Sequence, residues 1–170
     1  MCDIRYFKSA RHKFDAATVL LKDYEHDELF LNDVAYYLQQ CIEMTLKAYL
    51  ECVGVTVPNT HQIRKLINMS KNNGSAAVIT QWVEEHCGEI TEWEANTRYN
   101  FDYYLELNFL KEAIKEIEIF LEKNGLTEQL DLRVTEDVKI KILQRMPSES
   151  APKSNLEWNV YYRIFSKNKI

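Results

Sequence analysis

Apolar residues recur every three or four positions through most of the first three-quarters of the chain, the spacing that places them on one face of a helix. The pattern predicts helices at about residues 4–24, 28–53, 61–70, 75–87 and 104–123. Gly54, Gly88 and Gly125 follow three of these segments, and a glycine commonly ends a helix. Residues 89–103 are polar and aromatic with weak periodicity, so we expect a loop or a broken helix there. These features predict an up-and-down bundle of four to five helices.

The period of the pattern changes after Gly125. Apolar residues now alternate with polar ones in three runs, at 130–134, 138–142 and 156–164. Alternation in runs rich in Val, Ile, Tyr and Trp is typical of strands. A helix over residues 136–146, capped by Thr135, is the alternative for the middle run, but it would leave Ile140 off its apolar face. We therefore expect a small antiparallel β-hairpin or meander.

The segment at residues 147–155 is rich in Pro and Ser, which favours a flexible connector. The chain is thus expected to be mostly α, with a helical bundle at residues 1–125 and a β appendage at residues 126–170. Because a two-stranded ribbon alone is marginally stable in water, the appendage must pack on the bundle or pair with another chain.

Charge and composition restrict the classes of function. The net charge of −5 excludes a broad basic field, so a nucleic acid would have to bind through a local basic patch. The sequence has no stretch of about 18 apolar residues and no secretory signal at its start, so we expect a cytoplasmic protein without a membrane span. In that compartment its four cysteines would be reduced thiols. No cysteine or histidine spacing is typical of zinc, so we predict neither a metal nor another cofactor.

The second predicted helix carries a recognisable motif, YLQQCIEMTLKAYL, at residues 37–50. It is followed by Gly54, by Pro58 and by the pair Thr60-His61, and Arg98 lies further on between Thr and Tyr. In this order the elements resemble the HEPN family, whose second helix typically has a Gln-Gln, then a Glu and a Leu-Lys-Ala. The resemblance covers about residues 1–125 and leaves residues 126–170 outside it.

The resemblance implies an antiparallel helical bundle that commonly forms a homodimer. Many members belong to toxin–antitoxin and defence systems, where the typical partner is a small nucleotidyltransferase. Active members are metal-independent ribonucleases with an Arg followed four to six residues later by a His. Such chemistry needs a general base near neutral pKa for the 2′-hydroxyl and a permanent cation for the phosphate.

The residues after Arg98 depart from this catalytic pattern. Tyr103 stands where a spacing of four would place the His. An unperturbed Tyr titrates near about pH 10, so it is a poor base at neutral pH. Arg5 and His12 have a formal Arg-six-His spacing, but they lie in the first predicted helix, away from the family's usual place. Arg98 and Tyr103 remain the catalytic candidates.

Four further candidates for ligand binding lie on and after the second predicted helix. Gln40, Glu43 and Lys47, beside Gln39, would line a polar cleft; alternatively, Glu43 and Lys47 form only an ion pair between successive helical turns. His61 would bind phosphate at a helix start, where backbone N–H groups favour anions. The alternative for Thr60-His61 is a helix cap followed by a packing residue.

Arg98 is the candidate that matters most for ligand binding, together with Asn100 and Tyr104. These side chains could hydrogen-bond a phosphate or a base, and the surrounding aromatic residues could stack on nucleobases. The alternative is structural: Arg98 would pair with Glu92 or Glu94, or stack on Tyr99.

Three hypotheses follow. The leading one is an oligomerising HEPN module that binds RNA, a nucleotide or a partner protein near Arg98 without the usual catalytic His. The alternative is a metal-independent endoribonuclease, a HEPN toxin, that uses Arg98. The third is a structural adaptor whose C-terminal strands add to a partner's sheet.

Overall fold

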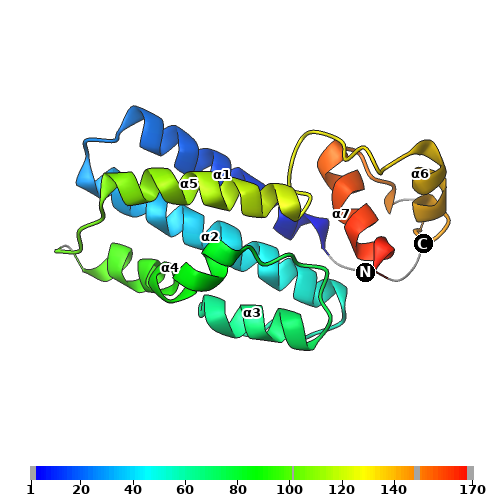
Figure 1. Ribbon diagram of the computed structural model, residues 1–170, viewed down its shortest axis with the longest axis horizontal. Helices are drawn as coiled ribbons and strands as arrows, with labels where there is room; N and C mark the ends of the chain where they lie inside the picture. The colour runs from blue at the N-terminus through cyan, green and yellow to red at the C-terminus, as the bar shows by residue number, and fades with distance from the viewer. Residues whose placement is uncertain (1–2, 101, 148–149, 168–170) are drawn as a thin grey trace. The chain divides into compact units, whose positions relative to one another are not determined.

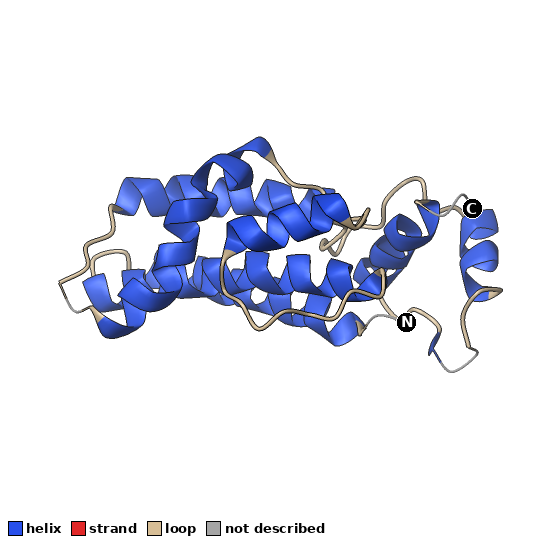
Figure 2. Ribbon diagram, turned by 90° about the horizontal axis from the view of Figure 1, so that it is seen from below, coloured by secondary structure: helices blue, strands red, loops and turns tan. Residues whose placement is uncertain are grey.

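The computed structural model describes residues 3–100, 102–147 and 150–167, and the regular structure in these ranges is helical (Figures 1 and 2). The helices are α1 (Ile4–Asp23), α2 (Glu28–Cys52), α3 (Ile63–Asn72), α4 (Gln81–Tyr99), α5 (Leu107–Lys123), α6 (Glu136–Leu143) and α7 (Asn155–Ser166). The chain divides into two compact units, Met1–Phe120 and Leu121–Ile170. A mostly helical fold is therefore confirmed.

Helices α1 and α2 form the antiparallel pair on which the first unit is built (Figure 1). Phe7 near the start of α1 packs edge-on against Tyr49 near the end of α2, with ring centroids 4.7 Å apart. Each helix begins after an aspartate whose carboxylate accepts a backbone N–H of the first turn, Asp3 for α1 and Asp27 for α2. Both helices match their predicted bounds to within one residue.

Helix α2 also contacts α3 and α4, so it lies at the centre of the first unit. The N–H of Ile63, the first residue of α3, donates to the Thr91 hydroxyl of α4 at 3.0 Å. An ion pair between Lys71 and Glu84 joins the same two helices. The start of α3 is thus bonded to the middle of α4, which fixes the segment just before α3.

The prediction that a helix ends at Gly88 is wrong, because α4 continues unbroken from Gln81 to Tyr99. Thr80 caps it by accepting the Val83 N–H. Its second half buries Ile90 and Trp93 completely. A glycine inside a helix costs about 1 kcal/mol relative to alanine, whereas burying an Ile and a Trp contributes several kcal/mol. Tertiary burial therefore outweighs the local signal to stop.

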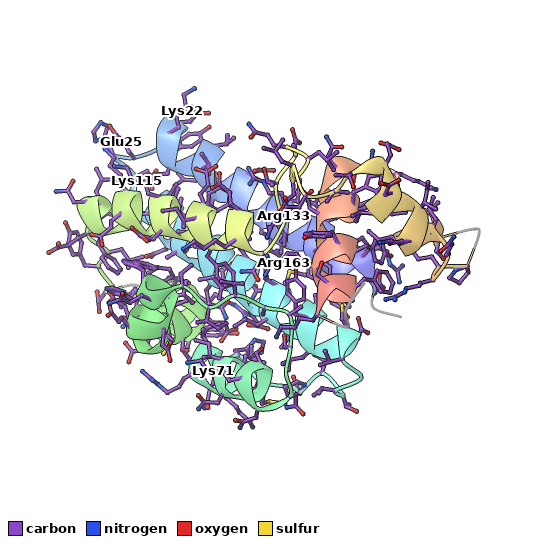
Figure 3. The ribbon with its side chains drawn as sticks, turned by 45° about the vertical axis from the view of Figure 1, so that its right-hand side comes forward. Lys22, Glu25, Lys71, Lys115, Arg133 and Arg163 are labelled. Carbon is purple, nitrogen blue, oxygen red and sulfur yellow. The ribbon has the colours of Figure 1, made fainter. Side chains whose placement is uncertain are left out.

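Helix α5 is tied to the rest of the first unit by polar contacts at two points. Trp82 on α4 donates its indole N–H to the Glu112 carboxylate at 3.0 Å. Lys111 pairs with Glu25 at 2.6 Å, and Figure 3 labels Glu25 at the turn between α1 and α2. The Lys111 ammonium group lowers the pKa of Glu25. The helix begins at Leu107, three residues after its predicted start, and ends at the predicted Lys123.

In the second unit the predicted β appendage is wrong, since the described part contains the helices α6 and α7 and no strand. Thr135 caps α6 by accepting the Val138 N–H, and Ser154 caps α7 by accepting the Glu157 N–H. The helix weighed as the alternative for the middle run is the one that forms. Ile140 indeed lies off its buried face and is 54% exposed. The predicted connector at 147–155 includes residues 148 and 149, which lie outside the described ranges.

A buried asparagine organises the loop before α6. The Asn159 side chain on α7 donates to the carbonyls of Gln129 at 2.8 Å and Thr127 at 3.4 Å, and accepts the Asp131 N–H at 2.8 Å. Gly125 adopts φ +77°, and a Cβ there would lie 3.2 Å from the Asn159 backbone. The turn after α5 therefore requires glycine both for its conformation and for its close approach to α7.

The three cysteines among the described residues fall into two groups. Cys41 and Cys87 are free and buried, and burial raises the pKa of the Cys41 thiol far above its usual range. Cys52 is disulfide-bonded, which contradicts the expectation of four reduced thiols. Among the described residues, no helix has the length and apolar character needed to cross a membrane.

Candidate functional site

Arg98 lies in the last turn of α4, and 43% of its side chain is exposed. Its Nη1 donates to Glu94 Oε1 at 2.6 Å and its Nη2 donates to the Tyr99 hydroxyl at 3.0 Å. The guanidinium carbon lies over two rings, 5.1 Å from the centroid of Tyr99 and 5.6 Å from that of Tyr36 on α2. The ion pair and the stacking expected as the structural alternative are therefore both present.

These contacts hold the guanidinium without saturating it. A guanidinium has five N–H donors, and Glu94 and Tyr99 each accept one of them in the described part of the chain. Contacts with the rings of Tyr36 and Tyr99 restrict its orientation, which lowers the conformational entropy lost when it binds a further group. The Arg98 side of this ion pair reaches solvent, so an anion can share the guanidinium with Glu94 through the donors that Glu94 does not use.

Tyr103 lies in the loop between α4 and α5 and is half-buried. Desolvation raises the pKa of its phenol, and the nearby carboxylates of Glu89 and Glu92 raise it further. The Trp93 indole lowers the pKa of Tyr103, but this effect is the smallest of the four. The hydroxyl therefore keeps its proton at neutral pH, which makes Tyr103 a worse general base than an ordinary tyrosine.

The candidates on α2 form one chain of hydrogen bonds centred on Glu43. The Glu43 side chain is only 6% exposed. Its carboxylate accepts from Gln39 Nε2 at 2.7 Å and from Lys47 Nζ at 2.7 Å, and it lies 3.1 Å from His61 Nδ1. Gln40 extends the chain by donating to the Gln39 amide oxygen at 2.9 Å. The predicted Glu43–Lys47 pair is thus present, but inside a larger network rather than on the surface.

His61 is the member of this network that reaches solvent, with half of its side chain exposed. Its ring is positioned from two sides. Glu43 holds Nδ1, and the bond from Ile63 to Thr91 fixes the backbone two residues later. A carboxylate on one ring nitrogen leaves the other available to a ligand or a reacting group.

The remaining candidates lie in the loop after α4. The Asn100 amide oxygen accepts the Asp102 N–H at 3.1 Å, so it shapes the turn. Tyr104 is exposed and lines a pocket with Tyr103, whereas Arg98 is not among the residues that line it. The structure therefore groups Arg98 with Tyr36 and Glu94, whereas Tyr103 and Tyr104 line a pocket to which Arg98 does not contribute.

Some of these neighbours could not be found from the sequence. Tyr36 precedes Arg98 by 62 positions, and no periodic signal connects a ring on one helix with a cation on another. Glu94 was expected as a partner because residues four apart face each other on a helix. Arg5, from the formal Arg-six-His spacing, binds Asp3 at the start of α1, so this arginine is committed to the helix cap.

The first unit is thus an antiparallel helical module with a partly exposed arginine at the end of α4 and a largely buried hydrogen-bonded network on α2. The chain belongs to the HEPN domain family, whose family model matches residues 5–126. This match confirms the family resemblance and covers most of the first unit. No curated protein and no solved structure matches the chain significantly.

Proposed function

We propose that this protein is a HEPN binding module that holds a phosphate of RNA or of a nucleotide on Arg98 and does not cleave it. The observation that carries the proposal is the guanidinium at the end of α4, exposed to solvent and stacked on Tyr36 and Tyr99. Phosphate and guanidinium match in geometry as well as in charge, and stacking on aromatic rings orients the donor fork. The net charge of −5 confines anion binding to such a local site.

The absence of cleavage rests on the residues after Arg98. Family spacing would place the catalytic His at position 103, 104 or 105, and these positions hold Tyr, Tyr and Leu. The tyrosine at 103 has a raised pKa and retains its proton. A site with a fixed cation and no base binds a phosphodiester without activating the 2′-hydroxyl.

Binding of a fluorescein-labelled single-stranded RNA, followed by anisotropy in EDTA, tests this proposal. Arg98→Ala should weaken binding about tenfold, the effect of removing one charge-assisted hydrogen-bonded contact. Arg64→Ala removes the same charge from an exposed position on α3 and should leave the affinity within about twofold. Denaturing gels of the same samples should show intact RNA. Equal losses in both variants, or cleavage that depends on Arg98, would overturn the proposal.

The Glu43–His61 pair favours a second candidate, the metal-independent endoribonuclease. A half-exposed imidazole oriented by a buried carboxylate is the arrangement of a general base, and it could replace the His missing after Arg98. This candidate predicts RNA cleavage in EDTA that both His61→Gln and Arg98→Ala abolish. Intact RNA with the wild-type protein, at concentrations that saturate binding, excludes it.

The homodimer and the small nucleotidyltransferase partner remain predictions drawn from the family, whose members often dimerise. The same holds for the cytoplasmic toxin–antitoxin setting. Light scattering coupled to size-exclusion chromatography tests the first of these predictions, with a mass of twice 20.1 kDa expected.

A further inference from the structure

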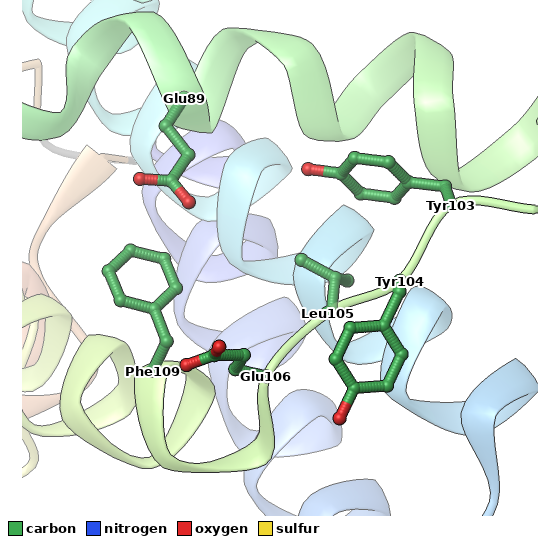
Figure 4. Close-up of a pocket in the computed structure, with 6 residues that line it drawn as sticks. All are labelled: Glu89, Tyr103, Tyr104, Leu105, Glu106 and Phe109. Atoms are coloured by element: carbon green, nitrogen blue, oxygen red, sulfur yellow. The ribbon is translucent and has the colours of Figure 1, made fainter.

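A pocket of about 380 Å³ opens beside the loop that joins α4 to α5 (Figure 4). It is lined by Glu89 of α4, by Tyr103, Tyr104, Leu105 and Glu106 of the loop, and by Phe109 of α5. Figure 4 shows the Tyr103 hydroxyl pointing towards the side of the pocket where Glu89 lies, with Glu106 beside the Phe109 ring. Two carboxylates and three aromatic rings thus face one cavity.

The wall formed by Phe109 is held in place by other rings. Its centroid lies 6.0 Å from that of Trp82, 5.7 Å from that of His86 and 6.1 Å from that of Trp93. Trp82 and His86 stack on each other at 4.3 Å, and Trp93 is completely buried. Because its support is rigid, Phe109 presents a fixed aromatic surface to the cavity.

The two carboxylates are not neutralised. Glu89 and Glu106 are exposed, and neither side chain forms an ion pair or a hydrogen bond within the described part of the chain. Their field reaches the pocket wall, since Glu89 raises the pKa of the Tyr103 phenol. The cavity therefore repels phosphates and attracts positive charge.

This pocket and the Arg98 site lie on different sides of α4. Glu89 and Arg98 are nine residues apart, which is about two and a half helical turns and places them on opposite sides. The neighbours of the two residues also differ: Arg98 lies over Tyr36 of α2, whereas Glu89 lines the pocket together with Phe109 of α5. A ligand of the pocket is thus independent of the phosphate site.

We propose that the pocket binds an organic cation, through a guanidinium or ammonium group placed between Glu89 and Glu106 and against the rings of Phe109 and Tyr104. Carboxylates supply the charge partners for such a group, and the negative faces of aromatic rings attract it further. The carboxylates and the aromatic rings both attract the positive charge of the ligand. A neutral or anionic ligand of similar size lacks this charge and would gain neither attraction. The group belongs either to a free small molecule or to an arginine side chain of another protein.

Isothermal titration calorimetry of the 170-residue protein tests the proposal with three probes. N-acetyl-arginine methylamide carries one guanidinium, agmatine is a free dication, and N-acetyl-citrulline methylamide is the neutral analogue of the first. The two cations should bind saturably and the citrulline compound should not. Tighter binding of the arginine derivative than of agmatine would indicate a protein side chain as the source, and the reverse order would indicate a small molecule.

Charge-neutralising variants locate the binding. The double variant Glu89→Gln/Glu106→Gln keeps size and polarity at two exposed positions and should weaken binding of both cations at least about tenfold. Glu118→Gln on the exposed side of α5 removes a charge outside the pocket and should change it less than about twofold. Chemical shifts of the Phe109 and Tyr104 rings, assigned by NMR, should move during titration of the wild-type protein.

Three results would overturn the proposal. One is the lack of saturable binding of either cation at low salt. The second is equal affinity for the citrulline compound. The third is a loss in Glu118→Gln as large as in the double variant, because binding would then follow net charge rather than this cavity. Circular dichroism of each variant verifies that the helices are retained.

Discussion

Replacing Glu43 should damage the fold of the first unit more than any other single charge change on α2. In Glu43→Ala the Lys47 ammonium group, 15% exposed, and the fully buried Gln39 amide both lose their acceptor, and His61 loses the partner of Nδ1. Removing one partner of a buried ion pair typically costs 3–5 kcal/mol. Because Lys47 keeps some access to water, we expect the lower end, about 3 kcal/mol.

Urea denaturation followed by tryptophan fluorescence measures this loss. Trp82 and Trp93 report on the first unit and Trp158 lies in the second, so the variants are best compared in a Trp158→Phe background. Glu43→Gln retains the shape and one acceptor oxygen, and should cost about 1–2 kcal/mol. Glu118→Ala, an exposed control, should stay within about 0.5 kcal/mol.

A loss below about 1 kcal/mol in Glu43→Ala would refute this reasoning, since it would show that Lys47 and Gln39 find other partners at little cost. Combining Glu43→Ala with Lys47→Met separates the pair from its surroundings. If the unpaired ammonium group causes most of the loss, the double variant should be more stable than Glu43→Ala alone.

Other predictions concern both units. Arg98→Ala should cost about 1 kcal/mol or less, because 43% of the Arg98 side chain is exposed although that of its partner Glu94 is only 16% exposed; circular dichroism of the variant separates the effect on RNA binding from unfolding. Gly125→Ala should destabilise the second unit by about 1–2 kcal/mol through the positive φ of that residue, measured by Trp158 fluorescence. The hydrogen bond from Arg133 lowers the pKa of Asp131 below its ordinary value of 3.8. When the pKa of a carboxyl group is lower in the folded than in the unfolded protein, its ionised form stabilises the fold. This stabilisation is complete at pH values above the unfolded-state pKa and is lost as the pH falls through the folded-state pKa. Acid titration of the second unit should therefore show a stability loss below about pH 4 that Arg133→Ala reduces.

The helices that sequence reasoning located well are those whose apolar face and caps agree. For α1 and α2 the three- and four-residue spacing runs the full length, and an aspartate precedes each helix. The signals conflict in α4, where Gly88 suggests an end and the burial of Trp93 requires continuation. Burial by distant residues is invisible to a local pattern, so the shorter helix was predicted.

The C-terminal segments show the reverse problem. Apolar residues at 156, 160 and 164 fit a helical repeat as well as an alternating one, so the period alone does not decide between them. The deciding signals are the caps, Thr135 and Ser154, whose hydroxyls accept N–H groups three residues later. Thr135 and Ser154 each stand just before an alternating run, and as caps they favour the start of a helix there rather than a strand.

The candidate residues are grouped in the fold in a way that their order in the sequence does not show. The candidates Gln40, Glu43, Lys47 and His61 lie in one hydrogen-bonded chain, in which Glu43 contacts Lys47 and His61 directly and Gln39 links Gln40 to Glu43. By contrast, Tyr104 was grouped with Arg98 because they are close in sequence, and it belongs to a separate acidic pocket. Residues that are close in sequence can face different sides of the molecule once a helix has ended, and the sequence alone does not show which side each one faces.

The salt dependence of RNA binding tests most directly whether Arg98 contacts a phosphate. Each phosphate contact on a single strand contributes about 0.7 to the slope of log affinity against log salt concentration. The slope for Arg98→Ala should therefore be smaller than that of the wild-type protein by about 0.7, while Arg64→Ala keeps the wild-type slope. Identical slopes for wild-type protein and Arg98→Ala would contradict the claim that this guanidinium binds phosphate.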